Sequence, residues 1–128
     1  MPLTDDDLAL YERARGASAN AYAPYSRFAV GAALITDGGQ VFTGANVENA
    51  SFGLTCCAER TAIFTAVSAG HTDLAAIAVH ADAESAPPCG ACRQVMAEFA
   101  PGLRVVWLRD GELVASTLGD LLPDGFSL

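Results

Sequence analysis

Residues 28–45 of this chain read FAVGAALITDGGQVFTGA, and the fold can be built outwards from them. Residues 28–36 form an apolar run typical of a buried strand, and residues 41–45 form a second run of the same kind. Asp37-Gly38-Gly39 stands between the two runs, and glycine tolerates the positive φ angles of tight hairpin turns. The stretch therefore predicts a β-hairpin with strands over residues 28–36 and 41–45.

A helix is predicted before this hairpin. Thr4 can cap its first turn, and Asp5, Asp6 and Asp7 put negative charge where the helix dipole favours it. The residues that continue the helical spacing are Leu8, Tyr11, Arg15 and Ala19. The pattern breaks near residues 23–24, because proline at position 24 disfavours helix before it.

After the hairpin, helices and strands alternate. Residues 46–55 read as a loop, and helices are predicted over residues 57–69 and 89–100, ended by Gly70 and by Pro101-Gly102. The first of these helices should carry its apolar side through Ile63, Phe64 and Val67. Strands are predicted over residues 74–80, 104–108 and 113–116, and residues 118–122 could form one helical turn.

The resulting order, α-β-β-α-β-α-β-β, predicts an α/β fold with one sheet of five strands and helices on its faces. The chain has 128 residues, which suits a single domain spanning residues 1–128. No internal repeat and no linker composition is visible in it.

The composition and the charge narrow the classes of function. No apolar run approaches 18 residues, and the first residues lack the basic and apolar regions of a signal peptide, so we expect no membrane partner and a cytoplasmic location. The net charge of −8 opposes binding to DNA or RNA phosphates, so no nucleic-acid partner is expected. A small uncharged nucleoside is not excluded by this charge. In a reducing compartment the four cysteines favour a metal or redox role over disulfides.

Two short motifs carry the chemistry: Cys57-Ala58-Glu59 and Pro88-Cys89-Gly90-Ala91-Cys92. Cys89 and Cys92 are three residues apart, so both thiols should project from one face of a first helical turn. Together with Cys57 they supply three zinc ligands and leave a fourth position open, which is the arrangement of catalytic rather than structural zinc sites. The pattern is close to the signature of zinc-dependent nucleobase deaminases.

The residues beside these thiols fit hydrolytic chemistry. Glu59 follows Cys57 by two positions, and a carboxylate there could take a proton from a zinc-bound water and deliver it to a substrate. Three thiolates and one Zn²⁺ sum to −1, and Arg60 could offset that charge by donating to a sulfur.

Cys56 competes with Cys57 for the role of third ligand. Adjacent helical residues point about 100° apart, so the two thiols cannot both serve easily. The spacing of ligand, one residue and glutamate selects Cys57, and Cys56 is interpreted as a buried small apolar residue.

The chain resembles the cytidine deaminase family, in its small homotetrameric form with three cysteine ligands. The matching stretches cover nearly the whole chain, and they are residues 23–34 (APYSRFAVGAAL), 46–53 (NVENASFG), 57–62 (CAERTA), 88–94 (PCGACRQ) and 121–126 (LLPDGF). The resemblance implies a three-layer α/β/α fold with a mixed five-stranded sheet. It also implies hydrolysis of cytidine or 2′-deoxycytidine to the uridine product and ammonia, as in pyrimidine salvage.

The resemblance also implies roles for single residues. Cys57, Cys89 and Cys92 would hold one Zn²⁺ per subunit, a zinc-bound hydroxide would attack C4, and Glu59 would protonate N3 and shuttle protons. Backbone groups near Ala58 and Cys89 would read the edge of the base.

For the rest of the nucleoside, the resemblance implies that Asn46 and Glu48 hydrogen-bond the ribose 3′-OH and that Phe28 lies against the pyrimidine. Taken alone, Asn46 and Asn49 favour a turn over a ligand contact, and Phe28 would be a core residue. Phe126 alone would be part of a frayed tail.

Two aromatic residues bear on assembly. By resemblance, Phe126 enters the site of a neighbouring subunit, so the active unit would be a homo-oligomer, and the family's form is a tetramer. Phe52 stands where relatives commonly carry a tyrosine whose hydroxyl reaches an adjoining subunit's sugar site, so that contact is weaker here.

Two other functions remain open from the sequence. The same zinc chemistry could act on another aminopyrimidine such as blasticidin S, although Asn46, Glu48 and Phe126 favour a nucleoside. A non-enzymatic zinc or thiol-redox module would instead require a fourth ligand or a reactive pair formed by Cys89 and Cys92.

Overall fold

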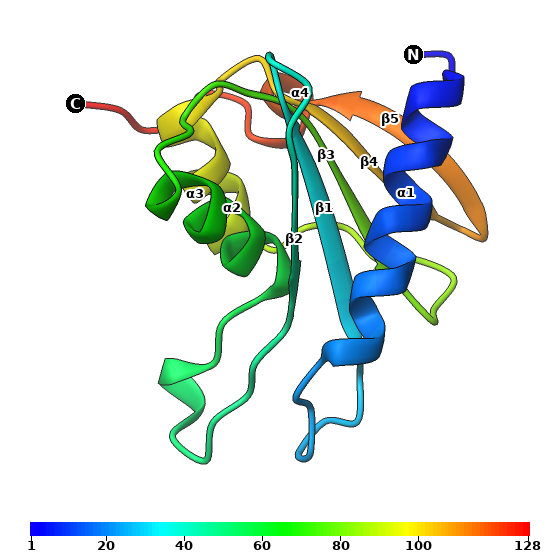
Figure 1. Ribbon diagram of the computed structural model, residues 1–128, viewed down its shortest axis with the longest axis vertical. Coiled ribbons are helices and arrows are strands. Elements are labelled where there is room, and N and C mark those ends of the chain that lie inside the picture. Colours follow the sequence, from blue (N-terminus) through cyan, green and yellow to red (C-terminus); the bar gives the residue numbers. More distant parts are fainter.

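The computed structural model describes residues 1–128 and contains one five-stranded sheet (Figure 1). Its strands are β1 (Val30–Thr36), β2 (Val41–Ala45), β3 (Leu74–Ala81), β4 (Arg104–Arg109) and β5 (Glu112–Thr117). The helices are α1 (Asp5–Ala17), α2 (Ala58–Ser68), α3 (Gly90–Phe99) and α4 (Leu118–Leu121), with short 3-10 helices η1 (Ser18–Asn20) and η2 (Phe52–Leu54). The predicted α/β class and order of elements are confirmed. The two 3-10 helices were not predicted, and β1 begins at Val30 rather than at position 28.

The sheet is mixed, with the strand order β2-β1-β3-β4-β5. Strand β1 pairs antiparallel with β2 and with β3, and β4 pairs antiparallel with β5. Only β3 and β4 are parallel. A parallel pair needs a crossover connection, and α3 lies in the segment that joins these two strands. This crossover places the start of α3 near the C-terminal end of the central strand β3.

Helices cover both faces of the sheet, with α1 on one side and α2 and α3 on the other (Figure 1). Alternate residues of a strand point to opposite faces, so β1 contributes Ala32 to the core under α2 and α3 and Ala33 to the core under α1. The predicted three-layer α/β/α arrangement is therefore confirmed.

Two glycines let helices approach the sheet closely. A Cβ at Gly31 would lie 2.0 Å from the carbonyl oxygen of Ala14 in α1, and a Cβ at Gly44 would lie 2.4 Å from the backbone nitrogen of Ala62 in α2. Both distances are too short for any side chain, so glycine is required at each position. The contact at Gly44 fixes the height of α2 above the sheet, and so the position of the helix start.

The helix predicted before the hairpin is confirmed, with Thr4 as its N-cap, but of the four residues predicted to continue its spacing only Tyr11 is buried. Leu8, Arg15 and Ala19 are exposed, and α1 ends at Ala17. The residues that α1 buries against the sheet are Asp7, Leu10, Tyr11 and Ala14. The side chain of Asp7 accepts hydrogen bonds of 2.8 and 2.6 Å from Arg104 of β4, a residue 97 positions later in the sequence. This contact turns the face of α1 that carries Asp7 toward the sheet, so Leu8 faces solvent.

The predicted apolar side of α2 was partly wrong. Ile63 is buried and Val67 is half-buried, but Phe64 is 46% exposed. The small residues Ala58, Ala62 and Ala66 take the buried face instead, because the close contact at Gly44 leaves no room for a larger side chain.

No helix in the chain is both long enough and apolar enough to cross a bilayer.

Candidate metal centre and the adjoining cavity

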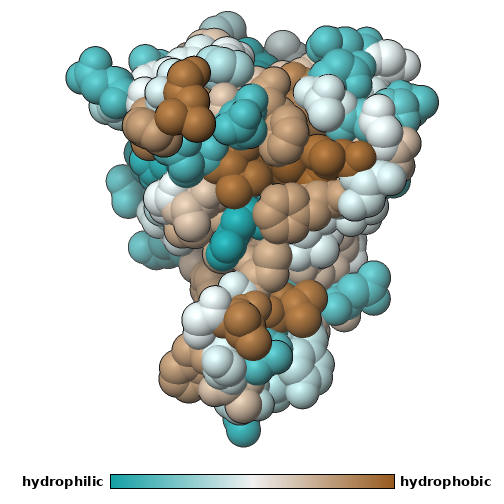
Figure 2. Space-filling view, turned by 90° about the vertical axis from the view of Figure 1, so that its left-hand side faces the viewer, coloured by the Kyte–Doolittle hydropathy of each residue, from teal (hydrophilic) through white to brown (hydrophobic).

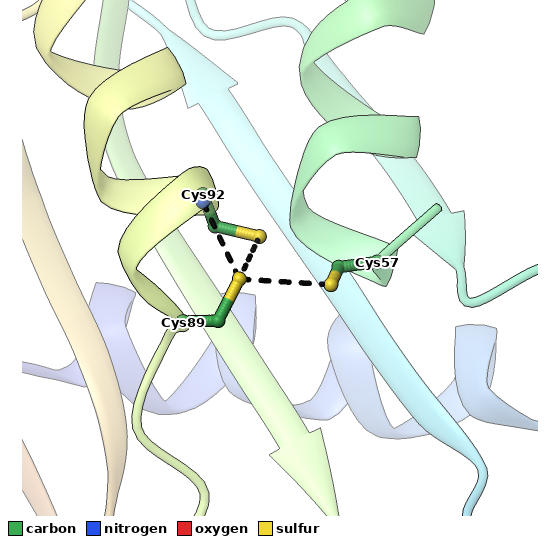
Figure 3. Close-up of side chains that lie close together, drawn as sticks. All are labelled: Cys57, Cys89 and Cys92. Carbon is green, nitrogen blue, oxygen red and sulfur yellow. Dashed lines mark hydrogen bonds between the residues drawn. The ribbon is translucent and has the colours of Figure 1, made fainter. Parts of the chain in front are cut away.

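Three cysteine thiols meet where α2 and α3 begin (Figure 3). Cys57 is the residue before α2, Cys89 is the residue before α3, and Cys92 lies in the first turn of α3. The distance between the sulfurs of Cys57 and Cys89 is 3.7 Å, and that between Cys89 and Cys92 is 3.2 Å. All three sulfurs lie within 4.8 Å of one another. Two segments separated in sequence are thus brought to one point by the crossover between β3 and β4.

The arrangement of these sulfurs fits a zinc ion. Zinc binds thiolates at about 2.3 Å in tetrahedral geometry, which sets sulfurs roughly 3.8 Å apart. The separation of 3.7 Å between Cys57 and Cys89 agrees with this value, whereas that of 3.2 Å between Cys89 and Cys92 is shorter and would have to widen around a bound ion. The group contains no fourth cysteine, histidine or carboxylate ligand. Cys56 points elsewhere, is half-buried rather than buried, and accepts a hydrogen bond from the hydroxyl of Thr61.

The pKa values of Cys57 and Cys92 are shifted in opposite directions. Hydrogen bonding from Cys92, and then from Arg60, lowers the pKa of Cys57 to about 5 despite the opposing effect of burial. The same contact with Cys57, together with burial, raises the pKa of Cys92. These contacts favour the thiolate form of Cys57 over that of Cys92, and a divalent cation would favour ionisation of all three thiols.

Glu59 lies in the first turn of α2 and is 4% exposed. Burial is the main cause that raises the pKa of this carboxyl, because the charged form is poorly solvated there. A raised pKa makes the protonated form of this carboxyl more accessible, which favours its use as both acceptor and donor of protons. The side chain also lines the cavity described next, beside Cys57 and Cys89.

A cavity of about 330 Å³ opens beside the thiols. Its volume falls at the lower end of the range of small-molecule sites. The predicted site residues that line it are Phe28, Asn46, Glu48, Cys57, Ala58, Glu59 and Cys89. Sequence reasoning missed other lining residues, namely Ser26, Val30, Thr55, Val79, Ser85, Ala86 and Pro87. These side chains are small or apolar and carry no chemical pattern, so only Ser26 and Val30, which lie inside the quoted stretch 23–34, could have been noticed.

Asn46 bridges the two loops that form one wall of the cavity. Its Nδ2 donates to the carbonyl of Phe28 at 2.8 Å, and its Oδ1 accepts from the backbone N–H of Val30 at 2.9 Å. The alternative of a turn made with Asn49 was wrong for Asn46, because only Asn49 makes a local bond, accepting from Ser51 at 2.9 Å. Asn46 keeps one donor hydrogen and one acceptor lone pair free for a ligand.

Glu48 accepts hydrogen bonds from the loop that precedes Phe28. Its Oε1 accepts from the backbone N–H groups of Tyr25 at 2.9 Å and Ser26 at 3.1 Å, and its Oε2 accepts from the hydroxyl of Ser26. The hydrogen bonds from Ser26 lower the pKa of this carboxyl. Glu48 is therefore a carboxylate at neutral pH, held at the mouth of the cavity.

Three aromatic side chains of the predicted site are exposed. Phe28 lines the cavity and is 44% exposed rather than a core residue. Phe52 in η2 is 75% exposed and packs edge-on against Tyr25, and Phe126 is 69% exposed. Neither Phe52 nor Phe126 lines the cavity of its own chain. Figure 2 shows apolar residues gathered on the face that carries α2 and α3 and on the lobe below it.

Comparison with known proteins gives consistent matches. A family model described as the cytidine and deoxycytidylate deaminase zinc-binding region matches residues 4–108. A cytidine deaminase of Halalkalibacterium halodurans is 54% identical over 121 residues, 92% of this chain and 92% of that protein. One from Mycobacterium tuberculosis is 46% identical over 129 residues, 100% of this chain and 94% of that protein. The crystal structure of cytidine deaminase from Burkholderia pseudomallei is similar with a TM-score of 0.89 and 53% identity, covering 97% of this chain and 100% of that one.

Proposed function

Because the chain belongs to the family of zinc-binding cytidine and deoxycytidylate deaminases, we propose that it hydrolyses cytidine and 2′-deoxycytidine to uridine and 2′-deoxyuridine, with release of ammonia. One observation in the structure carries this proposal. Three thiols without a fourth protein ligand form one cluster, and two of them, Cys57 and Cys89, line a nucleoside-sized cavity together with the buried Glu59.

In this reaction Cys57, Cys89 and Cys92 would hold one Zn²⁺ per chain. When bound there, zinc supplies Lewis acidity that lowers the pKa of a water from 15.7 toward about 7. Thiolates at helix N-termini are favoured by the helix dipole and by free backbone N–H groups. Cys57 and Cys89 are the N-cap residues of α2 and α3, and the sulfur of Cys89 accepts a hydrogen bond from the backbone N–H of Cys92.

Glu59 would move the protons. It would take a proton from the attacking water and deliver it to N3 of the cytosine ring, which makes C4 more electrophilic. It would then pass the second proton of the water to the departing amino group, so that ammonia leaves. Its pKa, raised by burial, supports this role, because a raised pKa makes the protonated carboxyl more accessible and lets the group act as base and acid in turn.

Asn46, Glu48 and Phe28 would hold the nucleoside. The free hydrogen of the Asn46 amide and the Glu48 carboxylate both lie at the cavity wall, and together they can donate to and accept from one ribose 3′-OH. The exposed ring of Phe28 offers a flat apolar surface for the pyrimidine. The backbone near Ala58 and Cys89 would contact the edge of the base.

The charges at the cavity favour a nucleoside over a nucleotide. No lysine, arginine or histidine lines the cavity, whereas Glu48 and Glu59 do. The net charge of −8 adds to this repulsion of phosphate groups and also opposes binding to RNA or DNA. Four free cysteines suit a reducing compartment, so we place the reaction in cytoplasmic pyrimidine salvage.

We further propose that the active unit is a homotetramer of single-domain chains. Phe126 and Phe52 are exposed large apolar side chains, and neither lines the cavity of its own chain. Exposed apolar residues of this kind are often interface residues. Phe126 would close the cavity of a neighbouring subunit, and Phe52 would contribute a weaker contact.

The test is turnover of cytidine by the purified protein, followed by the fall of the cytidine absorbance band. The expected result is turnover by the wild type and none by Glu59→Gln, with both proteins holding one zinc per chain. An active Glu59→Gln protein would contradict the assigned role of this residue. Cytosine and blasticidin S, assayed beside cytidine, should be poor substrates because they lack the ribose hydroxyl that Asn46 and Glu48 would bind in this way.

A further inference from the structure

We infer that Arg93 is a positioning residue for the metal centre, which holds the backbone before Cys89 against the C-terminal part of the chain. Nε of Arg93 donates to the carbonyl oxygen of Pro88 at 2.8 Å, and Nη1 donates to the carbonyl oxygen of Leu121 at 2.6 Å. A single side chain thus joins the segment leading to a proposed zinc ligand to the end of α4. The inference rests on the proposed function, because it assumes that the three thiols bind zinc.

The segment that leads to Cys89 is packed through the buried Pro88 but makes few other hydrogen bonds. Pro87 and Pro88 have no backbone N–H, so neither can donate a hydrogen bond. The last backbone donor before them is Ala86, which bonds to the carbonyl of Leu108 at 2.9 Å. No backbone group donates to the carbonyl of Pro88. Arg93 therefore provides the hydrogen bond that orients this peptide group.

Orienting that peptide group orients Cys89. The peptide bond between Pro88 and Cys89 is planar, so a fixed carbonyl oxygen also fixes the direction of the bond that enters Cys89. The sulfur of Cys89 lies between those of Cys57 and Cys92 in the cluster. A small rotation at this position would therefore change both sulfur–sulfur distances.

The other end of the contact is firmly held. Leu118, at the start of α4, is 1% exposed and belongs to the core under α2 and α3. Its backbone N–H donates to the carbonyl of Leu103 at 2.8 Å. Leu121 lies one turn later in α4, so its carbonyl offers Arg93 a fixed point. The planar guanidinium can reach two carbonyl groups at once, which a lysine ammonium does less well.

The neighbouring residue provides a matched control. Nε2 of Gln94 donates to the carbonyl of Phe126 at 3.1 Å, so Gln94 holds the tail and not the metal loop. Arg13 is an exposed arginine of α1 with no hydrogen bond or ion pair of its side chain. Arg13→Met therefore controls for the loss of one positive charge from an acidic protein.

The experiment measures metal binding rather than turnover. Zinc affinity of the metal-free proteins is determined by competition with a chromophoric chelator, and the visible absorption of the Co²⁺-substituted proteins reports the ligand geometry. Arg93→Met should weaken zinc binding roughly 10- to 100-fold and shift the Co²⁺ bands, as loss of a residue that orients a ligand does elsewhere. Arg93→Lys should lie between Arg93→Met and the wild type. Gln94→Leu and Arg13→Met should bind zinc within about twofold of the wild type.

Each outcome decides the inference. Wild-type affinity and an unchanged Co²⁺ spectrum in Arg93→Met would overturn it. If Arg93→Met does not fold, Arg93→Lys carries the test, and wild-type affinity and spectrum in that variant would overturn it as well. A wild-type protein that binds no zinc would instead refute the proposed function. A wild type that binds zinc and deaminates cytidine leaves only the role of Arg93 at stake.

Discussion

Nη2 of Arg60 donates a hydrogen bond to the sulfur of Cys57 over 3.3 Å. The two residues lie one helical turn apart at the start of α2, so the local helix geometry brings them together. A guanidinium beside a thiol favours the thiolate, and it would also balance the net charge of −1 that zinc and three thiolates carry. The contact links the acid–base state of the cluster to one basic side chain.

Removing the cation should raise the pKa of Cys57. This pKa is about 5 in the folded protein, lowered first by the hydrogen bond from Cys92 and then by Arg60. In metal-free Arg60→Gln the pKa should rise toward the ordinary thiol value, and in Cys92→Ala it should rise as well. A pH titration of thiolate ultraviolet absorbance measures both, with Cys57→Ser as the control that removes the titration. An unchanged pKa in Arg60→Gln would show that the cation does not stabilise the thiolate.

The buried carboxyl of Glu59 should cost stability when no metal is bound. Its folded-state pKa is raised, so the protonated form is favoured in the folded state and stability is lost as the pH rises above the ordinary glutamate pKa. Metal-free Glu59→Gln should therefore be more stable than the wild type at pH 7, by on the order of 1 kcal/mol. At pH 4 the difference should disappear. Urea denaturation at both pH values measures it, and equal stability at pH 7 would contradict the prediction.

The ion pair between Asp7 and Arg104 should hold α1 on the sheet. Asp7 is 4% exposed, and hydrogen bonds from Arg104 are the main cause that lowers its pKa. Asp7→Asn should destabilise the protein by about 2 to 3 kcal/mol, less than for a fully buried pair because Arg104 is partly exposed.

This stabilisation should be present above the ordinary aspartate pKa and should fade as the pH falls through the lowered folded-state value. Urea denaturation between pH 7 and pH 3 tests both statements. Arg15→Met, which removes the exposed ion pair between Arg15 and Glu12, is the matched control and should change stability by less than about 0.5 kcal/mol. Equal effects of the two substitutions would contradict the special role of Asp7.

The close contact at Gly44 should be needed for the metal centre as well as for the fold. A Cβ there would lie 2.4 Å from the nitrogen of Ala62 and 2.7 Å from the carbonyl oxygen of Ala58. Gly44→Ala must push α2 away from the sheet, which should cost about 1 to 3 kcal/mol or more and weaken zinc binding through Cys57. Gly16→Ala in α1 meets no atom within 4 Å, so it should stabilise the protein by roughly 0.5 to 1 kcal/mol. Thermal unfolding and zinc titration compare the two, and a neutral Gly44→Ala would refute this account.

Mixed oligomers should test whether Phe126 acts in a neighbouring subunit. Glu59→Gln should be inactive alone, and Phe126→Ala should be less active than the wild type. When the two variants are co-expressed and purified as mixed oligomers, some Phe126→Ala subunits keep Glu59 and receive Phe126 from a Glu59→Gln neighbour. Activity should then exceed that of either parent. Activity no higher than the mean of the two parents would show that Phe126 does not act across subunits.

Local sequence determined most of the elements and the chemistry of the metal site. The turn at Asp37-Gly38-Gly39 and the helix end at Gly70 follow from backbone preferences of single residues, and the structure has a hairpin and a helix end there. The spacing of Cys89 and Cys92 places both sulfurs together because one helical turn brings them to the same face.

Only the tertiary structure decided which faces are buried and how the cavity is closed. Leu8 and Phe64 are exposed although their spacing is helical, because Asp7 pairs with Arg104 and because Gly44 holds α2 close to the sheet. These relationships join residues that are far apart in the chain. No local pattern encodes them, since each depends on which surfaces the packed elements present to one another.

The same holds for the residues around the metal. The bond from Arg93 to Leu121 spans 28 positions, and that from the Ser26 hydroxyl to Glu48 spans 22. In the sequence Arg93 is simply an arginine after a metal motif. It can act as a positioning residue for Cys89 only in the folded chain, where α4 places the Leu121 carbonyl near its guanidinium. A hydrogen bond spans only about 3 Å, so it forms only after both groups have been brought together.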